Sequence, residues 1–120
     1  MPAQNDALRK QLSKRSEITI TVTGRRSKRK IALPVWFVWD DGTLYLLPVK
    51  GSDTQWYKNV LQQPSIGIKV RSAKTEVKVT PVTDAERVKS VIERFRAKYG
   101  AGDVKKYYSK FDVAVIAQTR

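Results

Sequence analysis

Cysteine and histidine are both absent from this chain of 120 residues. Without cysteine there can be no disulfide and no thiolate metal site, and without histidine there is no imidazole ligand or imidazole general base. Ser-His and Cys-His catalysis are therefore excluded. The 11 acidic residues are scattered, so we expect neither a paired-carboxylate hydrolase nor a metal site. If the chain is an enzyme, a bound cofactor should supply the difficult chemistry.

Long hydrophobic runs are also lacking. The longest stretch without a charge, Asn59–Ile68, contains Asn, two Gln and Pro, so it predicts no membrane span. The first six residues are polar and precede no apolar run, so we expect no secretory signal and take the cytoplasm as the default location.

Positive charge dominates the composition, with 24 Lys and Arg against 11 Asp and Glu and a net charge of +13. Such a charge predicts an anionic partner: nucleic acid, acidic lipid or a phosphorylated small molecule. Five of the six residues in Arg25–Lys30 are cationic, directly after Gly24. This loop could hold a phosphate with help from Ser27, or it could be a solvated hairpin tip that keeps strand edges from aggregating. No Gly-x-Gly-x-x-Gly or P-loop pattern occurs.

The length allows one domain, residues 1–120, with a short helix expected over 1–15 and a barrel over 16–120. Alternating apolar residues predict a strand over 18–22. The apolar run 31–39 predicts a strand buried on both faces, with a bulge or edge at Pro34. An Asp41-Gly42 turn leads to a third strand over 44–49. Two more strands, 66–70 and 77–79, form a hairpin turned at 72–74, and 113–117 supplies a sixth.

Helical spacing appears in two further places. Trp56, Tyr57, Val60 and Leu61 predict a helix ended by Pro64. A capping box at 83–86 starts another, with Val88, Val91, Ile92, Phe95 and Tyr99 on one face and Gly100 and Gly102 after it. A short helical turn then carries Tyr107 and Tyr108. The fold class is mainly β with helices (β/α+β): a small antiparallel barrel with helices outside.

Aromatic residues gather in the middle third: Trp36, Trp39, Tyr45, Trp56 and Tyr57. They could line a flat pocket for a ring-shaped cofactor or stack on unpaired bases. Large aromatics are more often core, which we expect for at least three of them. Lys50-Gly51 directly follows a predicted strand and could present a cation and a backbone N–H to an anion.

The order of five segments resembles the deazaflavin-dependent nitroreductase family, which belongs to the flavin-binding split β-barrels related to pyridoxamine phosphate oxidases. These segments are 23–27 (TGRRS), 33–38 (LPVWFV), 41–46 (DGTLYL), 50–51 (KG) and 56–59 (WYKN) with Pro64. The similarity covers roughly 18–118. It implies a six-stranded antiparallel split β-barrel with N-terminal, middle and C-terminal helices. It also implies an oxidoreductase that uses the deazaflavin coenzyme F-420, or FMN, FAD or haem as in some relatives, to pass hydride to a quinone or nitro compound.

The resemblance also implies roles for particular residues. Arg25, Arg26 and Ser27 match the loop near the phosphate side of the coenzyme, and Pro34, Val35 and Trp36 match the strand under its ring. Lys50 and Gly51 match the loop that closes on it, and Tyr107 and Tyr108 fall near the acceptor pocket. The chain departs from the family at Lys28, where glycine is usual, and at Ile31, where arginine is usual. Lys30 can take the place of that arginine, although an ammonium does not reproduce a guanidinium fork.

Two other functions fit the residues alone. One is a nucleic-acid-binding module that uses the aromatics and the 24–30 loop, and the other is a flavin or haem carrier without turnover. A homodimer is one assembly that split barrels adopt.

Overall fold

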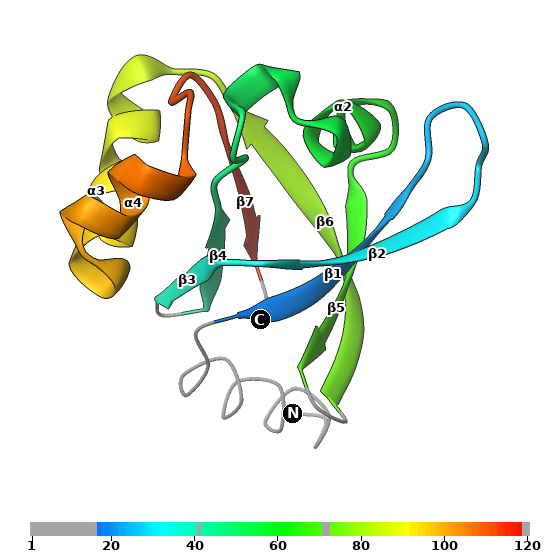
Figure 1. Ribbon diagram of the computed structural model, residues 1–120. Coiled ribbons are helices and arrows are strands. Elements are labelled where there is room, and N and C mark those ends of the chain that lie inside the picture. The colour runs from blue at the N-terminus through cyan, green and yellow to red at the C-terminus, as the bar shows by residue number, and fades with distance from the viewer. Residues whose placement is uncertain (1–16, 41, 71–72, 119–120) are drawn as a thin grey trace.

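The computed structural model describes residues 17–40, 42–70 and 73–118 (Figure 1). Seven strands appear in this part of the chain: β1 (Ile18–Thr23), β2 (Lys30–Val35), β3 (Phe37–Asp40), β4 (Thr43–Leu46), β5 (Ser65–Val70), β6 (Ala73–Val82) and β7 (Ala114–Gln118). They are accompanied by the 3-10 turn η1 (Gly51–Asp53) and the helices α2 (Gln55–Gln62), α3 (Ala85–Tyr99) and α4 (Ala101–Tyr107). The helix expected over 1–15 lies outside the described residues. None of the described helices is both long and apolar enough to cross a membrane.

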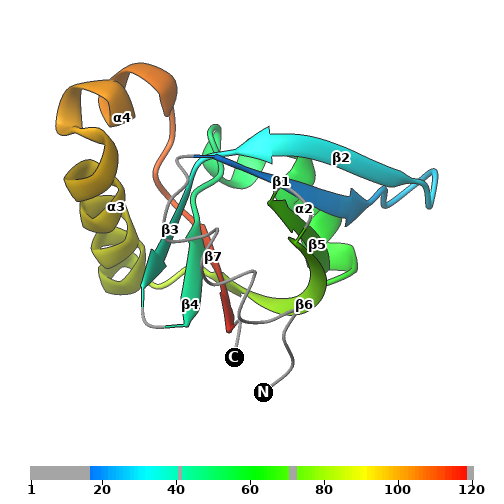
Figure 2. The ribbon, with the colours of Figure 1, turned by 90° about the horizontal axis from the view of Figure 1, so that it is seen from below.

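The strands form one antiparallel sheet in the order β2-β1-β5-β6-β7-β4-β3. Figure 2 shows this sheet curling into an incomplete barrel, with α3 and α4 outside the β3-β4-β7 side. The inward residues of β1 (Ile18, Ile20, Val22) and those of β4 and β5 fill the inside of the curl. A second apolar cluster lies between the sheet and α3 with α4. The predicted antiparallel barrel with outer helices is therefore confirmed.

The count of six strands was wrong, because the run 31–39 forms two strands that separate at Trp36. β2 pairs with β1 and β3 pairs with β4, so the two strands lie at opposite edges of the sheet. Pro34 lies in the edge strand β2, where the missing N–H interrupts no central ladder. The expected burial of both faces was also wrong, since Ala32 and Pro34 are exposed.

The helices follow the apolar spacing closely but differ at their ends. In α3, Val88, Val91, Ile92 and Phe95 are buried as predicted. The N-cap is Asp84 rather than Thr83, because the Asp84 carboxylate accepts a 3.0 Å hydrogen bond from the Arg87 N–H. Gly100 ends α3 with φ 95°, whereas Gly102 lies inside α4. Leu61 is 52% exposed on α2, although the spacing placed it on the buried face.

The remaining element bounds shift by only a few residues. β4 ends at Leu46 rather than continuing to residue 49. Val70 pairs with Ala73, so β6 begins at Ala73, inside the range 72–74 that was predicted as a turn. The chain after β4 leaves the sheet through η1 into α2 (Figure 1).

Candidate cofactor site

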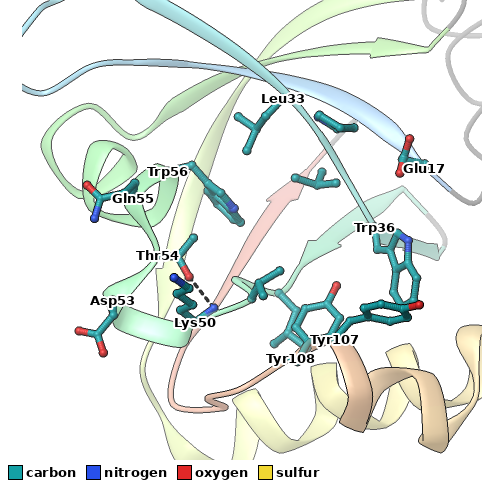
Figure 3. Close-up of a pocket in the computed structure, with 14 residues that line it drawn as sticks. Glu17, Leu33, Trp36, Lys50, Asp53, Thr54, Gln55, Trp56, Tyr107 and Tyr108 are labelled. Carbon is teal, nitrogen blue, oxygen red and sulfur yellow. Dashed lines mark hydrogen bonds between the residues drawn. The ribbon is translucent and has the colours of Figure 1, made fainter.

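A cavity of about 760 Å³ lies where the barrel wall is open, between β2, the segment from Leu47 to Trp56, and the end of α4. Its size is within the range of small-molecule sites. Figure 3 shows its lining: Glu17, Leu33, Pro34, Val35, Trp36, Leu47, Val49, Lys50, Asp53, Thr54, Gln55, Trp56, Tyr107 and Tyr108. Segments more than 70 positions apart in sequence therefore contribute to one site.

Aromatic rings stand on two sides of this cavity. Trp56 projects from α2, and Trp36 and Tyr107 lie together on the α4 side (Figure 3). The Trp36 ring meets Tyr107 edge-on at a centroid distance of 5.5 Å, and its centroid is 6.0 Å from that of Tyr108. Val49 and Tyr107 are among the few large apolar side chains that remain exposed in the described chain, at 44% and 51%. The site thus offers flat apolar surface that no described residue covers.

Tyr99 of α3 holds the Trp36 wall in place from behind. Its ring stacks on Trp36 with centroids 4.2 Å apart and planes 8° from parallel. Its hydroxyl accepts a 3.0 Å hydrogen bond from the Phe37 N–H and donates one of 2.8 Å to the Phe37 carbonyl. Burial raises the pKa of Tyr99 to about 12, so this hydroxyl keeps its proton at neutral pH. Lys98 also donates to the Phe37 carbonyl, at 2.8 Å.

Burial likewise changes the acidity of two groups around the aromatic wall. The pKa of Tyr108 is raised well above its usual value, chiefly because the ring is buried, and the nearby Tyr99 adds to the effect. The pKa of Lys98 is lowered to about 8 by burial. Tyr108 is therefore a neutral phenol at physiological pH, able to donate a proton in a hydrogen bond but not to act as a base.

Lys50 stands at the mouth of the cavity on a tightly held turn. Its N–H donates to the Thr54 hydroxyl at 2.8 Å, and the Gly51 N–H donates to the Pro48 carbonyl at 3.0 Å. Gly51 has φ 55°, and a Cβ added there would collide with the Asp112 carboxylate. Ser52 donates to that carboxylate through its N–H at 2.9 Å and its hydroxyl at 2.5 Å. Gly51 thus positions the turn that carries Lys50, although it does not itself line the cavity.

The ammonium of Lys50 makes no hydrogen bond or ion pair with any described residue. Asp53, the nearby carboxylate, is instead paired with Lys110 at 3.2 Å. Glu17, the other acidic group of the lining, lies across the cavity on the Trp36 side (Figure 3). A positive charge with no counterion among residues 17–40, 42–70 and 73–118 therefore lies at the mouth of an apolar cavity, an arrangement suited to a ligand with an anionic end.

Arg25 belongs to the basic loop, residues 25–30, and is connected to the edge of the cavity through hydrogen bonds to α2. Its N–H and its Nη1 both donate to the Asn59 side-chain oxygen, at 3.1 and 2.8 Å, and its Nη2 donates to the Gln55 oxygen at 2.9 Å. Asn59 is buried in α2, and Gln55 lines the cavity. Arg25 therefore fixes the loop to α2, while its own side chain does not line the cavity.

The other predicted residues of the basic loop lie away from this cavity. Ser27 accepts a 3.2 Å hydrogen bond from the Arg29 N–H within the turn, and Arg26 is exposed. Lys30 donates to the Thr23 hydroxyl at 3.1 Å and lines a different hollow of the sheet. The structure thus brings together Pro34, Val35, Trp36, Lys50, Tyr107 and Tyr108, but not Arg25, Arg26, Ser27, Lys30 or Gly51. Coenzyme contacts of this second group stay predictions.

Sequence reasoning missed seven of the lining residues: Glu17, Leu33, Leu47, Val49, Asp53, Thr54 and Gln55. Trp56 was one of the aromatic residues that could line a cofactor pocket, and it lines this cavity. The position of Thr54 before a predicted helix was the one available signal. The remaining residues belong to the site only because the chain leaves the sheet after β4.

Solved structures with the same architecture span most of the chain. An F420-H2 dependent reductase, FDR-A, is 19% identical with a TM-score of 0.67, covering 87% of this chain and 95% of its own. The haem storage protein HutZ from Vibrio cholerae is 12% identical with a TM-score of 0.70, covering 94% and 87%. A candidate pyridoxamine 5′-phosphate oxidase from Listeria innocua is 14% identical with a TM-score of 0.67, covering 95% and 90%. At these identities the similarity shows a shared split-barrel fold.

No curated protein matches the chain by sequence. One family model does, over residues 9–117. This match spans β1 to β7 and so includes both the sheet and every segment that lines the cavity. The chain therefore belongs to the family described as uncharacterized proteins conserved in bacteria (DUF2255).

Proposed function

We propose that this protein is a reductase that holds a deazaflavin (F-420) or a flavin in the cavity beside β2 and delivers hydride to a small conjugated acceptor. The observation that carries the proposal is an aromatic, apolar cavity with the Lys50 ammonium at its mouth, where no described residue pairs with that ammonium. A flat ring with a phosphorylated side chain needs these two surfaces next to each other. The shared fold with an F420-H2 dependent reductase supports the same assignment.

The residues of the cavity suit a flavin-type ring better than haem. A volume of about 760 Å³ accommodates a tricyclic ring, and Trp36 and Tyr107 offer faces and edges against which it can pack. Haem iron is held by His, Cys, Met or Tyr side chains. The chain has no His or Cys, and its one Met is residue 1, so tyrosine is the only axial ligand that the cavity could offer.

The bound coenzyme would supply the hydride, and the protein would supply binding and orientation. Trp36, backed by Tyr99, would offer an aromatic surface to the ring. Lys50 would neutralise the phosphate end, and the apolar residues Leu33, Leu47 and Val49 would exclude water from the ring. Tyr107 and Tyr108 face the same space and are the groups that would contact the acceptor, with Tyr108 a proton-bearing hydrogen-bond donor.

Tryptophan fluorescence during titration with F-420, FMN, FAD and haem tests the proposal. Trp36 and Trp56 line the cavity and Trp39 does not. Quenching should therefore fall in Trp36→Phe and Trp56→Phe but persist in Trp39→Phe, the matched control. Equilibrium dialysis measures binding independently of fluorescence. Quenching that depends on Trp39 alone, or no coenzyme bound below about 100 μM, would refute the cavity assignment.

Turnover separates a reductase from a carrier. The protein loaded with reduced coenzyme should oxidise it upon addition of a quinone, faster than the free coenzyme does. Tight binding with no acceleration by the protein would show a carrier and contradict the proposed activity.

A further inference from the structure

A second hollow, of about 890 Å³, lies on the outer face of the curled sheet, where β2, β1, β5 and β6 are neighbouring strands. The strand register places the residues on the floor of this hollow in rows that run across the strands. Ala32, Thr21 and Gly67 lie opposite one another across β2, β1 and β5. The outward-facing threonines of β1 are half-buried although they point away from the core. We call this hollow the outer groove.

Lysines stand at both ends of the outer groove. Lys30 lies at one end, opposite Thr23. Lys69 and Lys74 lie at the other end, directly opposite each other across β5 and β6, with Lys69 also opposite Thr19. Three ammonium groups are therefore among the residues that line the outer groove. Glu76 is the one acidic residue among those that line the groove in the described chain.

Gly67 is a second feature that points to a ligand. It lies in the middle of β5 and has no positive φ, and a Cβ added to it would meet the Thr21 Cβ at 3.4 Å, an ordinary contact. Neither backbone conformation nor packing therefore requires glycine at this position. Glycine inside a strand weakens it and often marks a place where a ligand or another backbone approaches closely. Here the missing side chain deepens the centre of the groove.

The chemistry of the groove favours a polymer of phosphates. Thr19 and Thr23 are four residues apart on β1, about 13 Å along the strand, so one phosphate that binds beside Lys69 leaves Lys30 without a counterion. None of the exposed large apolar side chains of the described chain lies in the groove, which disfavours an apolar protein interface. Three lysines and one acidic residue line the groove, so the same groove of a second copy would offer it no complementary charge.

The lining of the groove also distinguishes between nucleic-acid forms. No aromatic residue is among the described residues that line it, so unpaired bases have no ring on which to stack. Hydroxyl and ammonium donors instead match phosphate oxygens, which a duplex presents on its outside. Two further cations, Lys28 and Arg29, lie in the loop between β1 and β2, next to the end of the groove where Lys30 lies.

We propose that the outer groove binds the phosphodiester backbone of double-stranded nucleic acid without reading its sequence. This binding is independent of the cofactor cavity, which faces the interior of the barrel. It differs from the nucleic-acid mode suggested by the sequence, in which aromatic residues stack on bases.

Two charge-matched triple variants test the proposal. The groove variant removes three cations of the outer groove by combining Lys30→Gln, Lys69→Gln and Lys74→Gln. The control variant removes three exposed cations from α3 and α4 by combining Arg87→Gln, Lys89→Gln and Lys105→Gln. Fluorescence anisotropy with a short labelled DNA duplex gives the affinity over a range of salt. The groove variant should bind roughly tenfold or more weakly, and its plot of log affinity against log salt should be shallower by about 2.7, or ~0.9 per lost contact.

The outcomes decide the proposal directly. Equal losses in the two triple variants would show general attraction to a basic protein and overturn it. Tighter binding of a single strand than of the duplex, or complete competition by a mononucleotide at similar concentration, would also overturn it. Cofactor binding measured by dialysis should be unchanged in a double variant, Lys69→Gln with Lys74→Gln, which keeps the predicted coenzyme contact Lys30. This measurement separates the proposal from the proposed function.

Gly67→Thr supplies a test without a change of charge. A β-branched residue suits a strand better than glycine, so thermal stability should be kept or raised while duplex affinity falls. Should Gly67→Thr fail to fold, Gly67→Ala carries the same test, because its Cβ meets only an ordinary contact. Unchanged duplex affinity in a folded Gly67 variant would overturn the proposal.

Discussion

Trp36 and Tyr99 stack in parallel, 4.2 Å apart, and this contact joins the wall of the cavity to the helix α3. Trp36 lies at the point where β2 ends and β3 begins, so it has no ladder partner of its own. The Tyr99 hydroxyl supplies the missing restraint by bonding both the N–H and the carbonyl of Phe37. The orientation of the cavity wall therefore depends on a side chain that does not line the cavity.

Tyr99→Phe should lower the free energy of unfolding by about 1–3 kcal/mol, because it leaves a partly buried Phe37 N–H without an acceptor. The stacked ring remains, so the variant should fold. Urea denaturation measures the change. The control is Tyr107→Phe, whose side chain is 51% exposed and which should change stability by less than about 0.5 kcal/mol. Equal effects would mean that the Phe37 bonds contribute little.

The same tyrosine predicts how stability depends on alkaline pH. Burial raises the pKa of Tyr99 from 10.0 to about 12. Between these values the unfolded chain releases this proton and the folded protein keeps it, so the folded state binds more protons. The contribution of Tyr99 to the free energy of unfolding is therefore complete below pH 10 and is lost as the pH rises toward 12. The stability difference between the wild type and Tyr99→Phe should shrink across this interval, as unfolding curves at several pH values would reveal; a constant difference would contradict the shift.

Gly51→Ala should destabilise the turn that carries Lys50. The backbone there has φ 55°, and the new methyl group would collide with the Asp112 carboxylate. The left-handed conformation alone costs about 1–2 kcal/mol in a residue with a Cβ. The midpoint temperature of thermal unfolding and the affinity for the coenzyme should both fall. Gly102→Ala is the matched control. Nothing lies within 4 Å of the position of the added Cβ, and the residue is inside α4. This variant should therefore be more stable than the wild type by about 0.5–1 kcal/mol.

The spacing of apolar residues predicted those strands and helices that bury only one face. The alternation at Ile18, Ile20 and Val22 identified β1, and the spacing of Val88 and Phe95 identified α3. The break at Trp36 was not predictable in this way, because every residue around it is apolar and no polar residue or glycine marks the separation of β2 from β3.

The candidate site was predicted only in part, for a similar reason. Trp36 and Lys50 were named both from the residues and from a resemblance, Tyr107 was named from the resemblance alone, and all three share one cavity. Gln55 and Trp56 join them because the chain leaves the sheet after β4, which depends on how η1 and the 109–112 segment pack together. Lys30 was grouped with them as a replacement for the arginine that the resembled family usually has near this position, although the alternation of β2 places it on the opposite face from Leu33.

Lys50→Gln should weaken binding of a phosphorylated coenzyme while leaving the affinity for its ring unchanged. The ammonium has no protein counterion in the described chain, and a charge-assisted hydrogen bond contributes about 1.5–3 kcal/mol, equivalent to a roughly tenfold or greater change in affinity. FMN and riboflavin share one ring and differ by the phosphate, so the comparison isolates this contact; F-420 and its phosphate-free ring fragment serve equally well.

The expected result is a loss of affinity for FMN by roughly tenfold or more, with riboflavin unaffected. Lys58→Gln is the control, since it removes the same charge from neighbouring α2 at a residue that does not line the cavity. Long-range attraction alone would weaken FMN binding similarly in both variants and would do so less at high salt, because exposed charges are screened. A loss shared by FMN and riboflavin would indicate that Lys50 shapes the cavity rather than binding the phosphate. Isothermal titration calorimetry at two salt concentrations distinguishes these outcomes.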